Sequence, residues 1–393
     1  MTSIVTEWLP EVESITWLVP DQNRAKVLSE KLGNPKNLHW ETIHSASGNS
    51  QPPVLKKSYK DTLKEWVKKV PVLRKKAYAA YRRRMDSKIA QVAEQSGATH
   101  CWFHFVQGQS VPQLSIPVCG LVHDQNFRFY PENSPVGKPA QFREALEDWI
   151  AHADMVSVLS QAGKEEIHSL GPPPSARIEI IPNAILPVSG EVPEEKREER
   201  QFLYPAAALA HKNQILLFKA AIELAEQGHP CKFVICGKDT DLFHGNEPAN
   251  NTVVEEARIF YDQNRAVLSN YFEFKGECTW DELVKLYRTS FAVVLPSKYE
   301  GFGLPLVESL SRNTRVLCSN LIPFQEQVER YKAQDWVEFF DAEDSSSLAK
   351  AMLQTIQNPG TLPARFPVEN FSGWTWKDVA SRYLDLFQEL SSR

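Results

Sequence analysis

The second half of the chain alternates short apolar runs with longer amphipathic ones. The apolar runs lack a polar residue at every second position, which is typical of strands buried on both faces. They predict strands over Phe202–Ala206, Lys232–Gly237, Tyr271–Phe274, Phe291–Leu295 and Arg315–Cys318. The amphipathic runs predict helices over Lys212–Gln227, Val253–Ser269, Trp280–Arg288, Leu304–Leu310 and Phe324–Tyr331. Because parallel strands need crossover helices, this order predicts a parallel sheet with helices on both faces.

The first half shows a weaker form of the same alternation. The predicted strands are Ile15–Val19, Cys101–Val106, Val118–Val122, Val156–Leu159 and Arg177–Ile181, and the predicted helices are Phe142–Ile150 and Gln161–Leu170. A charged, proline-bearing stretch over Pro187–Arg200 is typical of a linker, and a last helix is predicted over Trp376–Leu390. We therefore expect an α/β protein with an N-terminal domain over residues 1–186, a C-terminal domain over 187–372 and a terminal segment over 373–393.

Composition fits two ordinary globular domains. The 393 residues are 42% hydrophobic and 24% charged, and the net charge of −5 does not indicate binding to nucleic acid along the whole chain. None of the six cysteines forms a Cys-x2-Cys pair, so we expect small buried thiols in a reducing compartment. No apolar run reaches the ~18 residues that a membrane helix needs, and the N-terminus lacks a basic-then-apolar signal layout. These features predict a cytoplasmic protein.

The stretch from Ser297 to Glu308 carries the clearest chemistry. It follows the apolar strand over 291–295, passes through a turn containing Gly301 and Gly303, and opens the helix from Leu304. Such a turn exposes backbone N–H groups and the positive end of a helix dipole, which together attract anions. Glu300 precedes those amides and Glu308 follows them inside the helix. An anion flanked by two carboxylates suits a sugar linked to a nucleotide diphosphate.

This segment resembles the Glu-x7-Glu signature of the retaining glycosyltransferases of family 4, the group 1 transferases of GT-B fold. The resemblance covers about residues 100–390 and implies two doubly wound, Rossmann-like domains facing across a cleft. It implies that Glu300 holds a hydroxyl of the donor sugar, that Glu308 binds ribose hydroxyls, and that the amides of Gly301, Phe302, Gly303 and Leu304 face the diphosphate. It also implies that the last helix crosses back onto the N-terminal domain.

Lys212 is the predicted cation for the diphosphate. It lies at the carboxyl end of the first strand of the second half, where ligands gather in open parallel sheets. It matches the lysine of the family's basic phosphate-binding turn, but the arginine that often precedes it is replaced by alanines and a leucine over 206–210. Gly237 and Gly276 end two further strands toward the same edge, and the resemblance places them beside the donor.

His123 and Asp124 end a predicted strand of the first half. The family often has a histidine at this point, near the donor sugar, and the histidine can hydrogen-bond a hydroxyl or carry a proton. Asp124 is expected to fix its tautomer or to bind the acceptor. The glycine-rich loop that follows the first strand in many members is absent, since the residues here are Val19 to Arg24. The acceptor is thus bound differently, or the donor contacts come almost wholly from the second domain.

Two other features stand outside this pattern. Asp239 and Asp241 form an Asp-x-Asp triplet after a strand, the metal–diphosphate motif of the other large glycosyltransferase fold, so a divalent ion on the diphosphate is the alternative to a metal-independent site. The stretch Lys56–Lys88 is dense in lysine and arginine with aromatic residues between them. It predicts a peripheral contact with an anionic membrane, a solvated helical face or, failing these, a site for a polyanion.

Together these features predict a retaining, metal-independent hexosyltransferase of polysaccharide biosynthesis. Its substrates would be a nucleotide sugar, with mannose favoured, and a glycan or lipid-linked acceptor. No cofactor or metal is expected, and no nucleic-acid partner. The alternatives are a sugar phosphorylase or nucleotide-sugar epimerase on the same scaffold, and a non-catalytic scaffold or regulatory subunit that keeps the fold.

Overall fold

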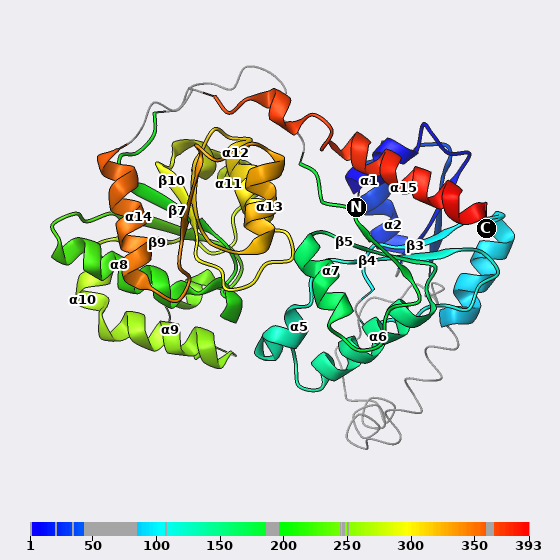
Figure 1. The fold of residues 1–393 in the computed structure, drawn as a ribbon, viewed down its shortest axis with the longest axis horizontal. Helices are drawn as coiled ribbons and strands as arrows, with labels where there is room; N and C mark the ends of the chain where they lie inside the picture. The colour runs from blue at the N-terminus through cyan, green and yellow to red at the C-terminus, as the bar shows by residue number, and fades with distance from the viewer. Residues whose placement is uncertain are drawn as a thin grey trace, which may run out of the picture.

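The computed structural model describes residues 2–19, 22–33, 35–42, 85–106, 108–185, 196–243, 245, 248–249, 251–358 and 365–392. These residues form an N-terminal lobe and a C-terminal lobe, each built around parallel strands (Figure 1). Most of the predicted linker, from position 187 to 195, lies outside the described residues, as do positions 56–84 of the basic stretch. No helix among the described residues is long and apolar enough to cross a bilayer.

The C-terminal lobe contains a six-stranded parallel sheet with the order β12-β11-β10-β7-β8-β9. Its strands are β7 (Gln201–Pro205), β8 (Lys232–Cys236), β9 (Phe272–Phe274), β10 (Ala292–Leu295), β11 (Arg315–Ser319) and β12 (Val337–Phe340). The central strands are buried along their whole length, as their continuous apolar sequences predict. The chain places β8 and then β9 on one side of β7, and afterwards places β10, β11 and β12 on the other side. The strand order therefore reverses between β7 and β10.

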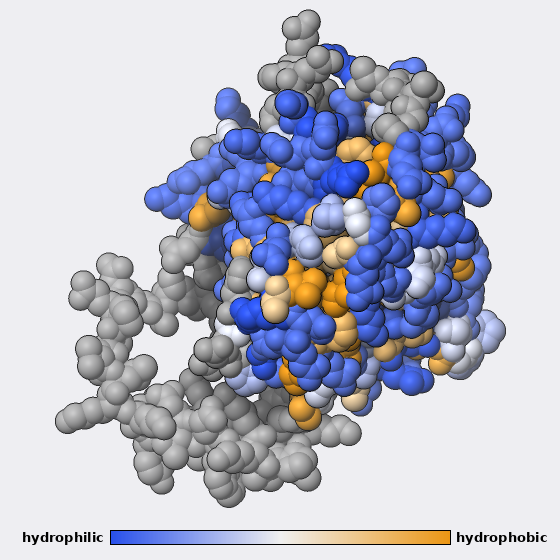
Figure 2. All heavy atoms as spheres, turned by 90° about the vertical axis from the view of Figure 1, so that its left-hand side faces the viewer, coloured by the Kyte–Doolittle hydropathy of each residue, from blue (hydrophilic) through white to orange (hydrophobic). Residues whose placement is uncertain are grey.

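Helices cover both faces of this sheet (Figure 1). They are α8 (Gln214–Glu226), α9 (Thr252–Gln263), α10 (Arg265–Leu268), α11 (Trp280–Thr289), α12 (Leu304–Leu310), α13 (Ile322–Arg330) and α14 (Ser345–Gln357). The single helix predicted over Val253–Ser269 is wrong, because Asn264 caps the end of α9 and the start of α10 and separates the two helices. The Asn264 side chain donates a hydrogen bond to the carbonyl of Phe260 (2.8 Å), which competes with the helical backbone pattern. Figure 2 shows the outer end of this lobe, hydrophilic over most of its surface.

The N-terminal lobe has two parallel sheets instead of one. β1 (Ile15–Val19) pairs with β2 (Leu38–Thr42), and β3 (Cys101–Phe103), β4 (Val118–Val122), β5 (Met155–Val158) and β6 (Arg177–Ile180) form a separate sheet in that order. Its helices are α1 (Thr2–Trp8), α2 (Gln22–Lys31), α5 (Asn126–Phe129), α6 (Lys138–His152) and α7 (Gln161–His168), and residues 85–96 are also helical. The six cysteines are free, and four of them are buried.

The last helix, α15 (Trp376–Ser391), lies against the N-terminal lobe beside α1 (Figure 1). The Trp8 indole N–H donates to the carbonyl of Ala380 (2.9 Å), and the Trp8 ring packs edge-on against Tyr383. The helix begins with a capping box in which Thr375 and Asp378 bond each other's backbone N–H groups. The two ends of the chain are therefore parts of one apolar cluster.

Arg197 joins the segment before β7 to the base of the C-terminal lobe. Its two terminal guanidinium nitrogens donate at 2.7 to 3.4 Å to the carbonyl oxygens of Tyr287, Ser290, Arg312 and Asn313 and to the hydroxyl of Thr314. These acceptors belong to the ends of α11 and α12 and to the turns that follow them. One side chain thus satisfies carbonyl groups that the two helices leave without an internal partner.

A candidate sugar-nucleotide site where the strand order reverses

Lys212 and Glu300 meet at the point where the strand order of the C-terminal sheet reverses. Lys212 follows β7 and Glu300 follows β10, and these two strands are neighbours. The Lys212 Nζ lies 2.6 Å from the Glu300 Oε1, and the two side chains are only 15% and 11% exposed. Crevices at such reversal points are where open parallel sheets bind ligands. The structure therefore brings together two residues that the sequence separates by 88 positions.

Short polar contacts fix the loops that carry this pair. Glu300 Oε1 also accepts a hydrogen bond from the Ser297 hydroxyl (2.7 Å), and the Tyr204 hydroxyl donates to the carbonyl of Lys212 (3.0 Å). Asn213, the N-cap of α8, has a positive φ of 58°, which asparagine tolerates better than most residues. Its side chain donates to the carbonyl of Pro296 (3.0 Å), which ties the β7 loop to the β10 loop.

The turn between Glu300 and α12 presents its backbone amides. None of the N–H groups of residues 301–304 donates a hydrogen bond to another described residue. Gly303 is the N-cap of α12 with φ +85°, and a Cβ there would overlap the Phe324 ring, so only glycine fits without strain. Phe302 is buried, Leu304 is 38% exposed, and the Gln327 amide donates to the carbonyls of Phe302 and Gly303. The unbonded amides remain available to an anion.

Glu308 lies one turn inside α12. It accepts a hydrogen bond from the Tyr287 hydroxyl (2.8 Å), and burial raises the pKa of its carboxyl above the ordinary value despite this bond and the nearby Arg312. The Tyr287 ring belongs to α11 and is fully buried, so it holds the carboxyl in a defined position. Glu308 is therefore a preorganised hydrogen-bond acceptor on the helix that follows the unbonded amides.

Gly237 and Gly276 come together at the ends of β8 and β9. The Gly237 N–H donates to the carbonyl of Gly276 (2.8 Å), and the two residues have φ +139° and +66°. A Cβ on Gly237 would lie 2.5 Å from the carbonyl carbon of Ala206, so this position needs glycine for a close approach of two loops. The predicted donor-side glycines thus shape the edge of the sheet beside Lys212.

The Asp239–Asp241 triplet lies next to these glycines. Asp239 has a positive φ of 62°, and Asp241 belongs to a 3-10 turn over Thr240–Phe243. Its carboxyl carbon would lie 3.9 Å from a Cβ on Gly276. Across the part of the chain that the structure describes, no three histidine, cysteine, aspartate or glutamate side chains gather as a metal site.

His123 and Asp124 face the same region from the N-terminal lobe. The His123 Nε2 lies 2.7 Å from the carbonyl of His104, and Asp124 Oδ1 accepts a hydrogen bond from the Asn126 N–H (2.9 Å). A Cβ on Gly301 would overlap the carbonyl oxygen of His123 and lie 2.8 Å from the Cβ of Asp124. The glycine turn of the C-terminal lobe therefore touches the loop that carries both predicted residues.

Further contacts between the lobes involve residues that sequence patterns do not mark. The Tyr299 hydroxyl accepts from the Gln125 N–H (2.7 Å) and donates to Glu166 Oε2 (3.0 Å). The Glu326 carboxylate accepts from the Gln161 N–H (2.9 Å) at the start of α7, where a negative charge complements the helix dipole. These partners are 133 to 174 positions apart, and no local spacing relates them.

His211, which precedes Lys212, joins the same interface. The Asn133 side-chain amide donates to its Nδ1 (3.0 Å), so the proton of the neutral ring is on Nε2. Burial, with a smaller contribution from Lys212, lowers the pKa of His211 to about 4. The ring is therefore neutral near pH 7 and adds no charge beside Lys212.

Glu166 makes the lobe contact sensitive to pH. Burial beneath Tyr299 raises the pKa of its carboxyl from 4.5 to about 7, against the effects of the Tyr299 hydroxyl and Arg128, and Asp124 adds to the rise. Between these two values the closed protein holds more protons than a form in which separation of the lobes exposes Glu166 to water, so the stability of this contact falls as pH rises. We expect the radius of gyration, measured by small-angle scattering, to increase from pH 5 to pH 8.

The Glu166→Gln variant should lose that dependence because its side chain stays neutral at every pH. Glu165→Gln, which changes the exposed neighbour on the same helix, is the matched control and should behave like the parent protein. An unchanged pH dependence in Glu166→Gln would contradict this assignment.

Solved structures place this architecture in the GT-B class. The chain is similar to a glycosyltransferase from Rickettsia africae, with a TM-score of 0.65 and 13% identity over 99% of this chain and 93% of that one. It is also similar to a sucrose-phosphate synthase from Thermosynechococcus elongatus, with a TM-score of 0.62 and 14% identity over 98% and 97%. The predicted α/β GT-B fold is thereby confirmed.

Sequence comparisons point to one family for the C-terminal lobe. Residues 189–367, a little under half of the chain, match the family model for glycosyl transferases group 1. It is 26% identical over 205 residues to the O-antigen chain mannosyltransferase RfbU of Salmonella typhimurium, which is 52% of either chain. It is 31% identical over 94 residues to the O-antigen chain mannosyltransferase B of Escherichia coli, 24% of this chain and 23% of that one. The matched region spans about half the length of RfbU and less of the second relative.

Proposed function

We propose that this protein transfers a sugar from a nucleotide-diphosphate sugar to a hydroxyl of a glycan or lipid-linked acceptor. The observation that carries the proposal is the Lys212–Glu300 pair, held where the strand order reverses and followed by the unbonded amides of residues 301–304. A cation and free N–H groups suit a diphosphate, and a carboxylate suits a sugar hydroxyl. The family match supports the same conclusion.

In this proposal each side chain has one task. Glu300 holds a hydroxyl of the donor sugar, Glu308 binds the ribose hydroxyls, and Lys212 with the turn amides stabilises charge on the leaving diphosphate. The bond from the anomeric carbon to the phosphate oxygen breaks, and a bond to the acceptor oxygen forms on the same face. The acceptor proton passes to a phosphate oxygen. Configuration is thus retained with no metal ion and no covalent intermediate on the protein, while His123 orients the sugar.

We propose a mannose-type donor, because RfbU and the Escherichia coli relative are named mannosyltransferases. A structure similar to this chain, HepE of Anabaena, is a complex with UDP and glucose, with a TM-score of 0.63 and 14% identity over 98% of this chain and 95% of that one. Guanosine and uridine diphosphate sugars are therefore the two donors to test. A cytoplasmic location and a peripheral membrane contact through residues 56–88 remain predictions.

Thermal shift with nucleoside diphosphates tests the proposal most directly. A diphosphate that binds the folded site raises the melting temperature according to RT ln(1 + [L]/Kd), and we expect a shift for one base, unchanged by EDTA. NMR of the glycoside product should show the anomeric configuration of the donor. A strict requirement for a divalent ion would favour the Asp239–Asp241 site instead.

Analysis of the products, with and without inorganic phosphate, separates the alternatives. Sugar release that depends on inorganic phosphate would indicate a phosphorylase, and an epimerised nucleotide sugar without transfer would indicate an epimerase. Nucleotide binding with no turnover of any donor would indicate a non-catalytic scaffold.

A further inference from the structure

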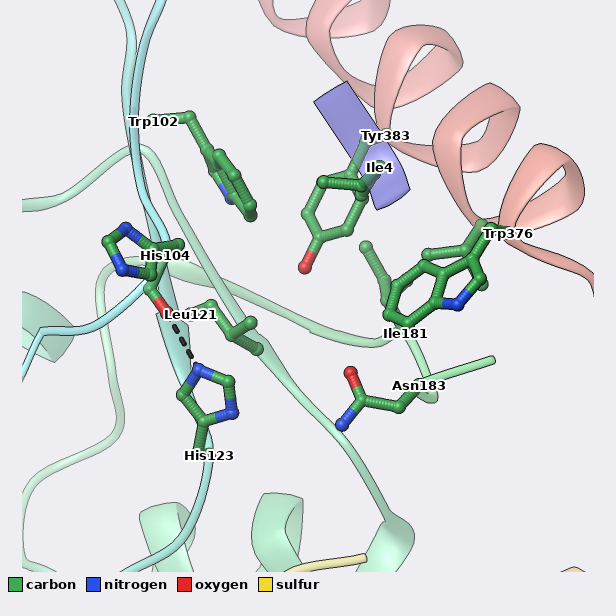
Figure 3. A pocket seen from close by; sticks show the side chains of 10 residues that line it. Ile4, Trp102, His104, Leu121, His123, Ile181, Asn183, Trp376 and Tyr383 are labelled. Atoms are coloured by element: carbon green, nitrogen blue, oxygen red, sulfur yellow. Dashed lines mark hydrogen bonds between the residues drawn. The ribbon is translucent and has the colours of Figure 1, made fainter. Parts of the chain in front are cut away.

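A small cavity lies in the N-terminal lobe beside His123. It is bounded by the carboxyl ends of β3, β4 and β6, by α1 and by α15, and its volume is about 50 Å³ (Figure 3). The residues that line it are Ile4, Trp102, His104, Leu121, His123, Ile181, Asn183, Trp376, Val379 and Tyr383. Lys212, Glu300 and Glu308 lie outside it, whereas His123, which is proposed to orient the sugar, lines it.

The polar atoms that line the cavity have defined roles as hydrogen-bond donors or acceptors. The carbonyl of His104 can only accept, so the His123 Nε2 donates to it and the neutral ring leaves a lone pair on Nδ1. Figure 3 shows the His123 ring and the Asn183 amide on the same side of the cavity. No described residue bonds the His123 Nδ1 or the Asn183 side chain. The Trp102 indole nitrogen, which also lines the cavity, is buried without a hydrogen-bond partner. The cavity thus offers the His123 lone pair, the Asn183 amide and an indole N–H.

The remaining walls are apolar and aromatic. Trp102, Trp376 and Ile181 face the polar pair, and the Tyr383 hydroxyl is already bonded to Ser157 (2.8 Å) (Figure 3). On the scale where one water occupies about 10–15 Å³, the cavity holds a few non-hydrogen atoms but no complete sugar ring. Its occupant is therefore a small substituent that has an N–H or O–H, an acceptor oxygen and an apolar end.

We propose that this cavity takes the acetamido group of an N-acetylated acceptor sugar. The acetamido N–H donates to the His123 Nδ1, its carbonyl accepts from the Asn183 amide, and its methyl group packs against Trp376. This inference rests on the proposed function and names the acceptor class of the same reaction. The acceptor is assigned because every lining residue lies in the N-terminal lobe or in α15, whereas Lys212, Glu300 and Glu308 lie in the other lobe.

Saturation-transfer NMR on the full chain tests the proposal without turnover. Methyl N-acetylglucosaminide and methyl glucoside are the probes, and we expect saturation of the acetyl methyl group and at least fivefold weaker binding of the glucoside. Asn183→Ala removes one hydrogen bond and should weaken binding of the acetylated probe by about five- to tenfold. Val379→Phe fills the cavity and should abolish saturation of the acetyl methyl group.

Two exposed positions provide matched controls. Asn358→Ala removes an exposed asparagine from the C-terminal lobe, and Lys377→Ala changes an exposed residue two positions from Val379 on α15. Both should bind the acetylated probe as the parent does. Melting temperatures of all four variants show whether each is folded. If Val379→Phe does not fold, the binding measured for Asn183→Ala decides the test.

Three outcomes would overturn the inference. Equal binding of the two probes would show that the acetamido group is not recognised. Unchanged binding of the acetylated probe by a folded Asn183→Ala variant would show that this cavity is not the binding site. If UDP-N-acetylglucosamine, but not the methyl glycoside, loses its acetyl saturation in Val379→Phe, the group belongs to the donor. Failure of the proposed function is distinct, because it would abolish nucleoside diphosphate binding and leave these probe signals unaffected.

Discussion

The Glu300→Gln variant should lose about 10²–10³-fold in kcat while it binds a nucleoside diphosphate at least as tightly as the parent. Glutamine keeps the size of the side chain but removes the charge that would orient the donor sugar, and loss of one preorganised electrostatic contact has effects of this size. Lys212, now without its 2.6 Å partner, is free to pair with the diphosphate. Diphosphate release measures kcat, and isothermal titration calorimetry measures nucleotide affinity.

Lys212→Met separates the two members of the pair. It should lose both turnover and nucleotide affinity, because the cation itself is gone and Glu300 then repels the diphosphate. Glu338→Gln changes an exposed carboxylate on β12; it is the charge-matched control for Glu300→Gln and should change neither quantity. Full turnover in Glu300→Gln would show that Glu300 has no part in the proposed reaction.

The Arg197→Ala variant should lose about 3 kcal/mol of unfolding free energy. Its guanidinium donates to four carbonyl oxygens and a hydroxyl, and hydrogen bonds from a charged donor contribute about 1.5–3 kcal/mol each before the loss is shared among neighbours. Removal takes the side-chain donor from the carbonyls of Ser290 and Asn313, whereas those of Tyr287 and Arg312 can still accept from the Thr314 hydroxyl. Urea unfolding followed by hydrogen exchange in the C-terminal lobe measures the loss, since a two-lobed chain need not unfold in one step.

Arg143→Ala is the matched control for charge and size. Arg143 pairs with Glu147 on an exposed helical face, and such pairs contribute at most about 1 kcal/mol. Arg197→Lys should fall between the two variants, because one ammonium cannot reach all five acceptors. Equal stability of Arg197→Ala and Arg143→Ala would show that the guanidinium contacts add nothing.

Three predicted elements agree with the structure to the residue. β1, β4 and α12 begin and end where predicted, because their apolar runs are bounded by polar or glycine-containing turns. No such run marks β12, an edge strand in which buried Val337 and Phe340 flank the exposed Glu338. β3 ends at Phe103 instead of Val106, because the chain turns there to present His104.

The grouping of Lys212, Gly237, Gly276 and Glu300 could be predicted from sequence, because each follows a buried strand and parallel strands bring their carboxyl ends to one edge. That these residues bind the donor stays a prediction. The contacts of Tyr299, Glu166 and Glu326 could not, because they depend on how one lobe rests on the other. Asn183 was missed for the same reason, since its cavity needs α15 from the far end of the chain.

The fit of Gly301 against His123 has a consequence for the timing of turnover. The carbonyl oxygen of His123 rests on a residue that has only a hydrogen for a side chain, so the two halves touch one position away from Glu300. In the proposed reaction, the donor would enter and the spent nucleotide would leave while the halves are apart. The frequency of that separation would then set a ceiling on throughput that no improvement in bond-breaking chemistry could exceed.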